Sequence, residues 1–142
     1  MILLDTNVLS ELMRPRPDAG VLKWFDHQPA AGLWISAITR AEIELGIALL
    51  PAGKRRQAIA DTADAMFRED FNGRCLPFDE QAAGHYAVIV AHRTLLGKPI
   101  TAEDAQIAAI ARSNDLTLAT RNVKDFVGIE DLVIVDPWKQ DV

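Results

Sequence analysis

Cysteine and aromatic residues are scarce in this sequence of 142 residues. Cys75 is the only cysteine, and Phe, Trp and Tyr together make up 6% of the chain. A single cysteine excludes an intramolecular disulfide and suits a reducing compartment, so we expect a cytoplasmic protein. Hydrophobic residues make up 49% of the chain, enough to form a core without cross-links, and the length fits a single domain over residues 1–142.

Long hydrophobic runs are also lacking. The sequence starts with three apolar residues and then a carboxylate (Ile2-Leu3-Leu4-Asp5), with no basic segment before them, which is typical neither of a signal peptide nor of a membrane span. No other run approaches the roughly 18 apolar residues that a span requires. We therefore expect no membrane association.

Positive charge is in deficit, since the formal net charge is −5. An acidic protein is not a general nucleic-acid coat, because phosphate binding depends on clustered Lys and Arg. Two interpretations remain open: the protein ignores nucleic acid, or it gathers its acids at one site where cations bridge them to phosphate. The sequence also lacks G-x-G-x-x-G, a phosphate-cradling glycine loop and a serine nucleophile elbow, which argues against dehydrogenases, NTPases and serine hydrolases.

Short apolar runs alternate with longer amphipathic stretches along the chain. We predict strands over 2–4, 33–36, 116–119 and 133–135, with a weaker candidate over 74–77. We predict helices over 8–13, 18–26, 40–50, 54–70, 80–96 and 103–112. This alternation predicts an α/β three-layer sandwich, in which a short parallel sheet of about five strands is flanked by helices.

Three carboxylates share a position in this predicted fold. Asp5 ends the first strand, Glu42 lies in the first turn of the helix after the second strand, and Asp104 lies in the first turn of the alanine-rich helix 103–112. In a parallel sheet, the strand C-termini and helix N-termini meet at one edge, where ligands usually bind. The three acids are therefore expected to meet in one crevice.

Each acid also has a purely structural interpretation. Thr39-x-x-Glu42 and Thr101-x-x-Asp104 resemble capping boxes, and Asp5 could cap the helix that follows it. Capping is compatible with metal binding, because a helix N-terminus holds a carboxylate ionised and orients it. The convergence of the three acids, rather than any one of them, favours a functional site.

A cluster of acids needs a compensating charge. Two carboxylates about 5 Å apart repel by roughly 3 kcal/mol at an effective dielectric constant near 20, so three are strained unless a divalent cation lies between them or some are protonated. Oxygen ligands suit Mg²⁺ or Mn²⁺, and such an ion polarises a phosphodiester and activates water for in-line attack. The negative net charge is then no objection to nucleic-acid chemistry.

Short segments in order along the chain resemble the motifs of one family. They are Ile2–Ser10 (ILLDTNVLS), Ser36–Glu42 (SAITRAE) with Leu45-Gly46, Leu76–Asp79 (LPFD), Ala102–Ala109 (AEDAQIAA), and Leu118–Asn122 (LATRN) with Asp125-Phe126. These segments resemble PIN-domain toxins of the VapC type, and the FitB-like branch in particular. Each segment is short, but their agreement in order over a chain of this length is specific.

The resemblance implies a PIN-like fold and a Mg²⁺- or Mn²⁺-dependent endoribonuclease, the toxin of a type II toxin–antitoxin pair. Such toxins are usually homodimers held inactive by a cognate antitoxin that also binds operator DNA, and tRNA is a frequent substrate. The resemblance makes Asp5, Glu42 and Asp104 catalytic metal ligands and places Asn122 at a fourth catalytic position that is often Asp. Asn can ligate through its carbonyl but carries no charge, so we do not infer a second metal.

Polar residues beside the acids have supporting roles in this interpretation. Thr6 and Thr120 match hydroxyl positions that the family places beside the acids, where they orient ligands or water, and Asn7 adjoins the first acid. Arg121 and Lys124 lie next to the expected site in sequence and are candidates for holding an RNA phosphate backbone.

The other acids near these motifs are expected to have structural or surface roles. We expect Glu44 and Glu103 to be solvated surface acids, and Asp79 to cap the helix 80–96. Glu11 is expected to be solvated as well, although it is close enough to Asp5 in sequence to line the crevice.

Two other functions remain open. Asp5 at a strand end could be the nucleophile of an aspartyl-phosphate phosphatase, a chemistry that commonly uses a second Asp two residues on, where this chain has Asn7. The other alternative is a catalytically weak PIN-like module that binds an antitoxin or regulates without cleaving RNA. The uncharged Asn122 is the feature that supports it.

Overall fold

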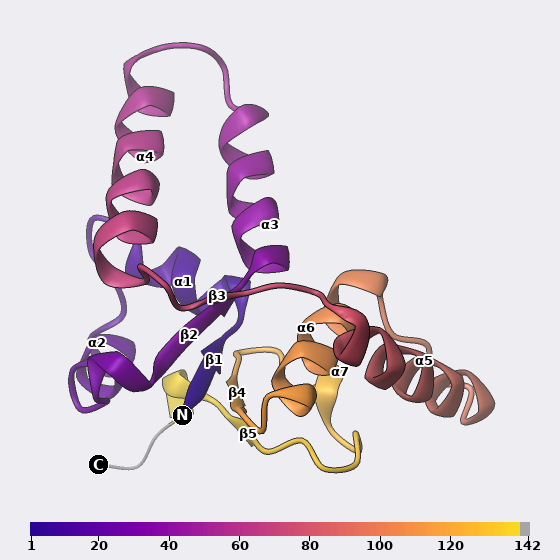
Figure 1. The fold of residues 1–142 in the computed structure, drawn as a ribbon. Helices are drawn as coiled ribbons and strands as arrows, with labels where there is room; N and C mark the ends of the chain where they lie inside the picture. Colours follow the sequence, from indigo (N-terminus) through magenta and orange to yellow (C-terminus); the bar gives the residue numbers. More distant parts are fainter. Residues whose placement is uncertain (140–142) are drawn as a thin grey trace.

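A five-stranded parallel sheet lies at the centre of the protein. The computed structural model describes residues 1–139, so the last three residues of the domain expected over 1–142 lie outside the described part. The strands are β1 (Ile2–Leu4), β2 (Leu33–Ser36), β3 (Cys75–Leu76), β4 (Thr117–Ala119) and β5 (Ile134–Val135). They lie in the order β3-β2-β1-β4-β5 (Figure 1), which confirms the predicted parallel sheet.

The register of the strands brings their C-terminal ends to one edge. β1 is central, pairing Leu3 with Trp34 of β2 and with Leu118 of β4, and every paired strand is parallel. The chain goes outward from β1 through β2 to β3 and then crosses back to β4 on the other side of β1. The strand order therefore reverses beside β1, which is where ligands bind in open parallel sheets.

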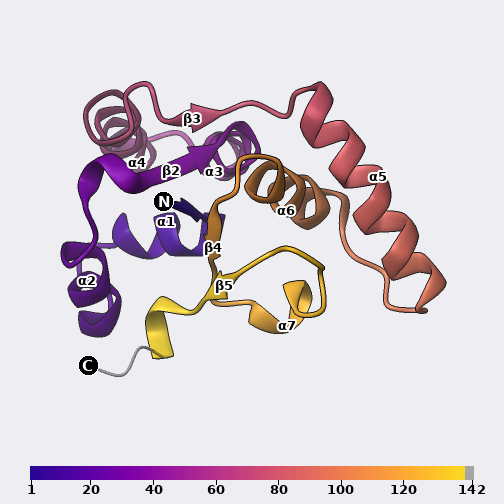
Figure 2. The same ribbon diagram turned by 60° about the horizontal axis from the view of Figure 1, so that its bottom comes forward.

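Helices cover both faces of the sheet. They are α1 (Thr6–Leu12), α2 (Ala19–Asp26), α3 (Ala37–Ala48), α4 (Lys54–Ala65), α5 (Glu80–Leu95), α6 (Ala102–Ser113) and α7 (Val123–Phe126). Figure 2 shows α1 to α4 on one side of the strands and α5 to α7 on the other. Because successive side chains of a strand point to opposite faces, Leu3 belongs to the core beneath α5, α6 and α7, whereas Leu4 belongs to the core beneath α1 to α4.

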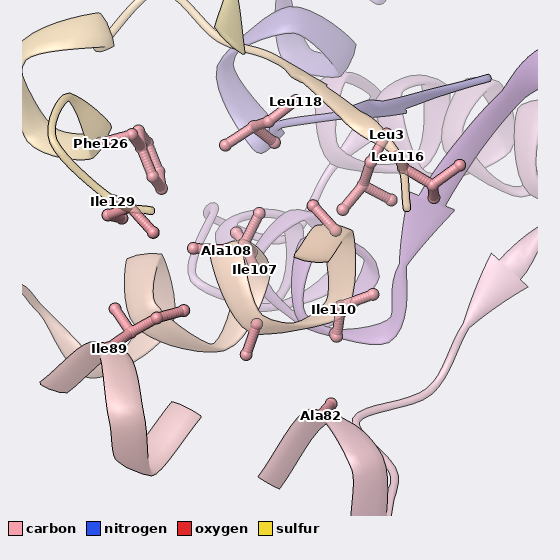
Figure 3. Close-up of a cluster of buried hydrophobic side chains, with 12 residues drawn as sticks. Leu3, Ala82, Ile89, Ile107, Ala108, Ile110, Leu116, Leu118, Phe126 and Ile129 are labelled. Atoms are coloured by element: carbon pink, nitrogen blue, oxygen red, sulfur yellow. The ribbon is translucent and has the colours of Figure 1, made fainter. Parts of the chain in front are cut away.

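The alanine-rich helix α6 lies tightly against the sheet. Ala105, Ala108, Ala109 and Ala111 are completely buried, as is Ile107. Small side chains allow the helix backbone to approach the sheet closely, and Figure 3 shows α6 between the strands and α5. Because α6 runs antiparallel to the strand β4 that follows it, the N-terminus of α6 lies at the edge where the strands end.

Helices α3 and α4 form an antiparallel pair that projects beyond the sheet (Figure 1). The helix predicted over 40–50 begins earlier, at Ala37, because the hydroxyl of Ser36 accepts a hydrogen bond from the backbone N of Thr39 at 3.1 Å and caps the helix there. The helix predicted over 54–70 is confirmed in its bounds, as α4 runs directly into a π-helical turn over residues 66–70. Met66 and Phe67 in this turn are both buried in the core beneath α1 to α4.

The structure adds one short helix and bears on the expectation about the membrane. The four-residue helix α7 was missed, because a single turn is too short to display helical periodicity. Among residues 1–139, no helix is both long enough and apolar enough to span a bilayer.

Candidate functional site

A crevice of about 530 Å³ opens at the edge where the strands end. Its lining includes the three predicted acids together with four of the polar residues that the sequence singled out: Asp5, Glu42, Asp104, Thr6, Asn7, Arg121 and Asn122. These residues come from the end of β1, from α1, α3 and α6, and from the segment after β4. The predicted meeting of acids that are far apart in the sequence is therefore present in the tertiary structure.

Asp5 is the most deeply buried of the three predicted acids, with only 4% of its surface exposed. It caps α1, because its Oδ1 accepts a hydrogen bond from the backbone N of Thr6 at 2.8 Å. Its Oδ2 accepts from the hydroxyl of Thr120 at 2.7 Å. Burial raises the pKa of Asp5 to about 6 against the effect of these two hydrogen bonds, and the charges of Asp104 and Glu42 raise it further.

Asn7 and Thr120 form a hydrogen-bonded support around Asp5. The Nδ2 of Asn7 lies 3.3 Å from both Asp5 Oδ2 and Thr120 Oγ1, and Thr120 Oγ1 also accepts from the backbone N of Asn122 at 3.0 Å. On its other side, Asn7 Oδ1 accepts from the backbone N of Arg121 at 3.2 Å. Asn7 therefore ties β1 to the segment after β4 and offers an amide donor at the place where an aspartyl-phosphate phosphatase would use an acid.

Glu42 lies in the second turn of α3, not in the first turn as predicted, since the helix begins at Ala37. The interpretation of Thr39 and Glu42 as a capping box is thus wrong. Instead, the hydroxyl of Thr6 donates to Glu42 Oε1 at 2.8 Å and lies 3.0 Å from the hydroxyl of Thr39. Because the single proton of Thr6 goes to Glu42, Thr39 is the donor to Thr6, and a completely buried hydroxyl supports the acid through a second one.

Asp104 lies in the first turn of α6, as predicted. Thr101 caps this helix, with its hydroxyl accepting from the backbone N of Asp104 at 3.2 Å. Burial raises the pKa of Asp104, and the charges of Asp125 and Glu103 raise it further, while the Thr101 hydrogen bond and the charge of Arg93 oppose this rise. Asp104 is thus a capped helix residue and a crevice acid at once.

The donor chemistry of the crevice fits a hard divalent cation. Its acids offer only oxygen ligands, the set that Mg²⁺ and Mn²⁺ prefer, and the raised pKa of Asp5 reflects a cost that such an ion would relieve. Across residues 1–139, however, no three His, Cys, Asp or Glu side chains already lie close enough together to hold an ion. If the three acids held a metal, the more accessible side chains of Glu42 and Asp104 would have to turn towards Asp5.

The remaining predicted residues differ in their positions. Asn122 and Arg121 are exposed and line the crevice, whereas Lys124 is exposed on α7 outside its lining. Glu44 and Glu103 are exposed, as predicted, and Asp79 caps α5.

Glu11 corrects a prediction, because it is only 6% exposed. Its carboxylate accepts from the backbone N of Asp18 at 2.9 Å and pairs with Arg14 at 3.2 Å. The chain returns after α1 and places the Asp18 amide against Glu11, an approach that the helical spacing alone does not reveal. Glu11 also lines the crevice, so the solvated interpretation is wrong and the crevice interpretation is right.

Trp138 lines the crevice as well and was missed by the sequence analysis. A usable signal was present, because Trp138 follows the last predicted strand and therefore belongs to the same edge of the sheet as the acids. Its indole ring lies beneath the guanidinium of Arg121, with 5.0 Å between the guanidinium carbon and the ring centroid.

Comparison with known proteins gives a consistent family assignment. The family described as PIN domain matches residues 2–130. Toxin FitB of Neisseria gonorrhoeae is 43% identical over 97% of this chain and 99% of its own length. The VapC ribonuclease Y4jK of Sinorhizobium fredii is 42% identical over 98% of this chain and 99% of its own.

Solved structures agree with the sequence relatives. The FitAB complex bound to an IR36 DNA fragment contains a chain with a TM-score of 0.92 and 41% identity, covering 100% of this chain and 99% of that one. A chain of VapBC-1 from nontypeable Haemophilus influenzae has a TM-score of 0.82 and 30% identity, covering 98% and 100%.

The chain belongs to the PIN-domain family, and its parallel α/β fold matches that of the FitAB chain. Within that family its relatives are toxins of the VapC type, FitB among them. The predicted PIN-like fold and the resemblance to the FitB-like branch are both confirmed.

Proposed function

We propose that this protein is a metal-dependent endoribonuclease, the toxin of a type II toxin–antitoxin pair, and that Asp5, Glu42 and Asp104 hold its Mg²⁺ or Mn²⁺. The observation that carries the proposal is the meeting of these acids in one crevice, where the buried Asp5 has a pKa of about 6. Such strain at a functional site is expected where a cation completes the charge balance. The names of the relatives VapC ribonuclease and Toxin FitB agree with it.

In this proposal the protein supplies positions for the chemistry. When bound, the divalent ion polarises the scissile phosphodiester and activates water. Asp5 is fixed by Thr6, Thr120 and Asn7, and Glu42 is oriented by the Thr6 hydroxyl. These hydrogen bonds orient ligands as outer-shell partners of a metal commonly do.

The uncharged Asn122 holds the fourth catalytic position of the proposal. It lies on the crevice, with its backbone N bound to Thr120. Its side-chain oxygen can orient water or ligate, but it contributes no charge to a second ion. We therefore propose one metal rather than two.

The proposed partners follow from the same relatives. The FitAB and VapBC structures are complexes of a toxin with an antitoxin, in some cases bound to DNA. We propose that this chain likewise pairs with a cognate antitoxin, forms a homodimer, reaches operator DNA only through the antitoxin, and acts on cytoplasmic RNA, with tRNA as the first substrate to test.

One alternative retains a specific observation. A catalytically weak module that only binds an antitoxin is favoured by Asn122 and by the absence, within residues 1–139, of three side chains already gathered for a metal. This alternative expects antitoxin binding without metal-dependent cleavage, and indifference to the loss of Asp104.

The deciding experiment is cleavage of a total tRNA pool by purified protein with Mg²⁺, Mn²⁺ or EDTA. Asp104→Asn is compared with Glu103→Gln, which removes one negative charge from the exposed neighbouring residue on α6. Discrete fragments that vanish with EDTA and in Asp104→Asn, but persist in Glu103→Gln, would support the proposal. Identical behaviour of wild type and Asp104→Asn on tRNA and on other RNAs, with or without metal, would favour the binding module.

A further inference from the structure

The crevice contains a cationic side chain that its acids do not neutralise. Two arginines line the crevice, Arg14 and Arg121. Arg14 pairs with Glu11 at 3.2 Å, whereas in residues 1–139 no carboxylate lies within ion-pair distance of Arg121. A guanidinium in a crevice lined by four carboxylates, yet unpaired with any of them, is available to an anion from outside.

The backbone and side chain of Arg121 are both held in place. Its backbone N donates to Asn7 Oδ1 at 3.2 Å, and Asn7 lies only two positions after Asp5 in the sequence. Its guanidinium carbon lies 5.0 Å from the centroid of the Trp138 ring. This separation is within the range of an attractive cation–π contact.

Trp138 is itself anchored to the body of the protein. It lies in the 3-10 turn Pro137–Lys139, and its backbone N donates to Asp136 Oδ1 at 2.9 Å. Its ring packs against the core beneath α1 to α4. The ring is therefore a fixed support for the guanidinium end of the Arg121 side chain.

We propose that Arg121 and Trp138 form a phosphate-binding subsite for the RNA backbone at the rim of the acidic crevice, in which Trp138 positions Arg121. This inference rests on the proposed ribonuclease function. When a ring covers one face of a guanidinium, the in-plane N–H donors remain free at its edge, and they match phosphate oxygens in pairs. The subsite would take a phosphate next to the one that is cleaved, because Arg121 adjoins the acids without lying among them.

The local electrostatics explain why such a subsite is needed. In the proposed function a divalent ion would compensate the three acids, but the flanking phosphates of an RNA strand would still approach negative side chains. Lys124, the other candidate from the sequence, lies outside the crevice lining and cannot serve this purpose at the same place. Arg121 is thus the cation in the right position.

The test measures binding of fluorescein-labelled total tRNA by anisotropy at several KCl concentrations, with Ca²⁺ replacing Mg²⁺ or Mn²⁺ and the RNA checked for integrity. Arg121→Gln should raise Kd roughly tenfold, the loss of one charge-assisted contact, and lower the salt slope by about one. Arg112→Gln is the control, because it makes the same charge change in the last turn of α6, whereas the crevice lies at the first turn of that helix.

A double-mutant cycle separates positioning from direct contact. Trp138→Leu should raise Kd about threefold in the wild-type background and have no further effect in Arg121→Gln. An equal loss in both backgrounds would overturn the positioning role, because Trp138 would then contact RNA itself. Unchanged binding in Trp138→Leu, with a lowered Tm only, would reduce the pair to a structural clasp.

Cleavage measured in parallel distinguishes this inference from the proposed function. Wild type that cleaves and binds tRNA, while Arg121→Gln binds no worse than Arg112→Gln, would overturn the subsite alone. Wild type that neither binds nor cleaves any RNA tested, with or without Mn²⁺, would overturn both.

Discussion

The two sides of the crevice are built differently. On the side of β1 and β4, Asp5 is 4% exposed and accepts hydrogen bonds from a backbone amide, a hydroxyl and an amide side chain. On the helical side, the exposed Glu42 carboxylate accepts from the Thr6 hydroxyl, while the half-buried Asp104 donates its backbone N to the Thr101 hydroxyl. One acid is thus fixed by the sheet, while two stand on helices in contact with solvent.

This difference would serve two requirements of the proposed metal site. A buried, fully hydrogen-bonded carboxylate defines a fixed point, and it also carries the desolvation cost that raises the pKa of Asp5 to about 6. More accessible carboxylates can change rotamer at low cost and close around an ion when it arrives. The site therefore combines one rigid acid with two adjustable ones.

The largest expected effect is the loss of the rigid acid. Asp5→Asn should lower the rate of tRNA cleavage at least ~10²-fold, on the scale of removing one preorganised electrostatic contact. Glu42→Gln should lower it less, because an adjustable ligand is more easily replaced by water. Initial rates in Mn²⁺ measure both, and equal losses for the two variants would contradict the division of the site into rigid and adjustable sides.

The second prediction concerns stability without metal. The pKa of Asp5 is raised in the folded protein, so its stabilising effect is complete below about pH 4 and is lost as the pH rises through about 6. In EDTA, Asp5→Asn should therefore gain up to about 3 kcal/mol of unfolding free energy relative to wild type between pH 4 and pH 7. Urea melts at several pH values measure this difference, and a difference that does not change with pH would disprove it.

The third prediction concerns the hydroxyls beneath the adjustable side. Thr39→Val removes the proton that the buried Thr39 donates to Thr6, which leaves Thr6 less firmly directed at Glu42. The Kd for Mn²⁺ should rise about tenfold, at the lower end of losses at outer-shell positions, and Thr39→Ser should restore it. Calorimetric titration of the RNA-free protein measures this. Equal Mn²⁺ affinity in Thr39→Val and wild type would leave Thr39 as a packing residue only.

The smallest expected effect belongs to the cap of α6. Thr101→Ala should lower the free energy of unfolding by about 1 kcal/mol, because the backbone N of Asp104 loses its partner. Thr94→Ala, at an exposed position within α5, is the matched control and should cost nothing, since Ala favours helix. Thermal melts of the two variants compare them, and equal stability would show that the cap is dispensable.

Local patterns predicted much of this architecture. The strands at 2–4 and 33–36 have the predicted bounds, because each is a short, mostly apolar run that is too short for a buried helix. The helices over 80–96 and 103–112 differ from α5 and α6 by one residue at each altered end. Asp5 and Asp104 could be assigned to one edge because strand direction alone fixes that edge in a parallel sheet.

The errors arose from a choice between two neighbouring caps and from a contact made when the chain returns. The start of α3 was placed at Arg40 because Thr39 resembles a cap, but Ser36 is the cap and Thr39 is drawn inward to Thr6. Glu11 was assigned to solvent because its burial depends on the return of the chain to Asp18. The first error is a choice between two local caps, whereas the second depends on a partner brought close by the return of the chain.

Composition, the strand and helix periods and the positions of the acids were sufficient to determine an α/β protein with a carboxylate cluster at one sheet edge, because these depend on local conformation and strand direction. Only the tertiary structure decided that Asp5 is buried and Glu42 exposed, that Thr39 supports Glu42 through Thr6, and that Trp138 lies beneath Arg121. Burial and hydrogen bonding join residues separated by tens of positions, so they depend on how the whole chain packs.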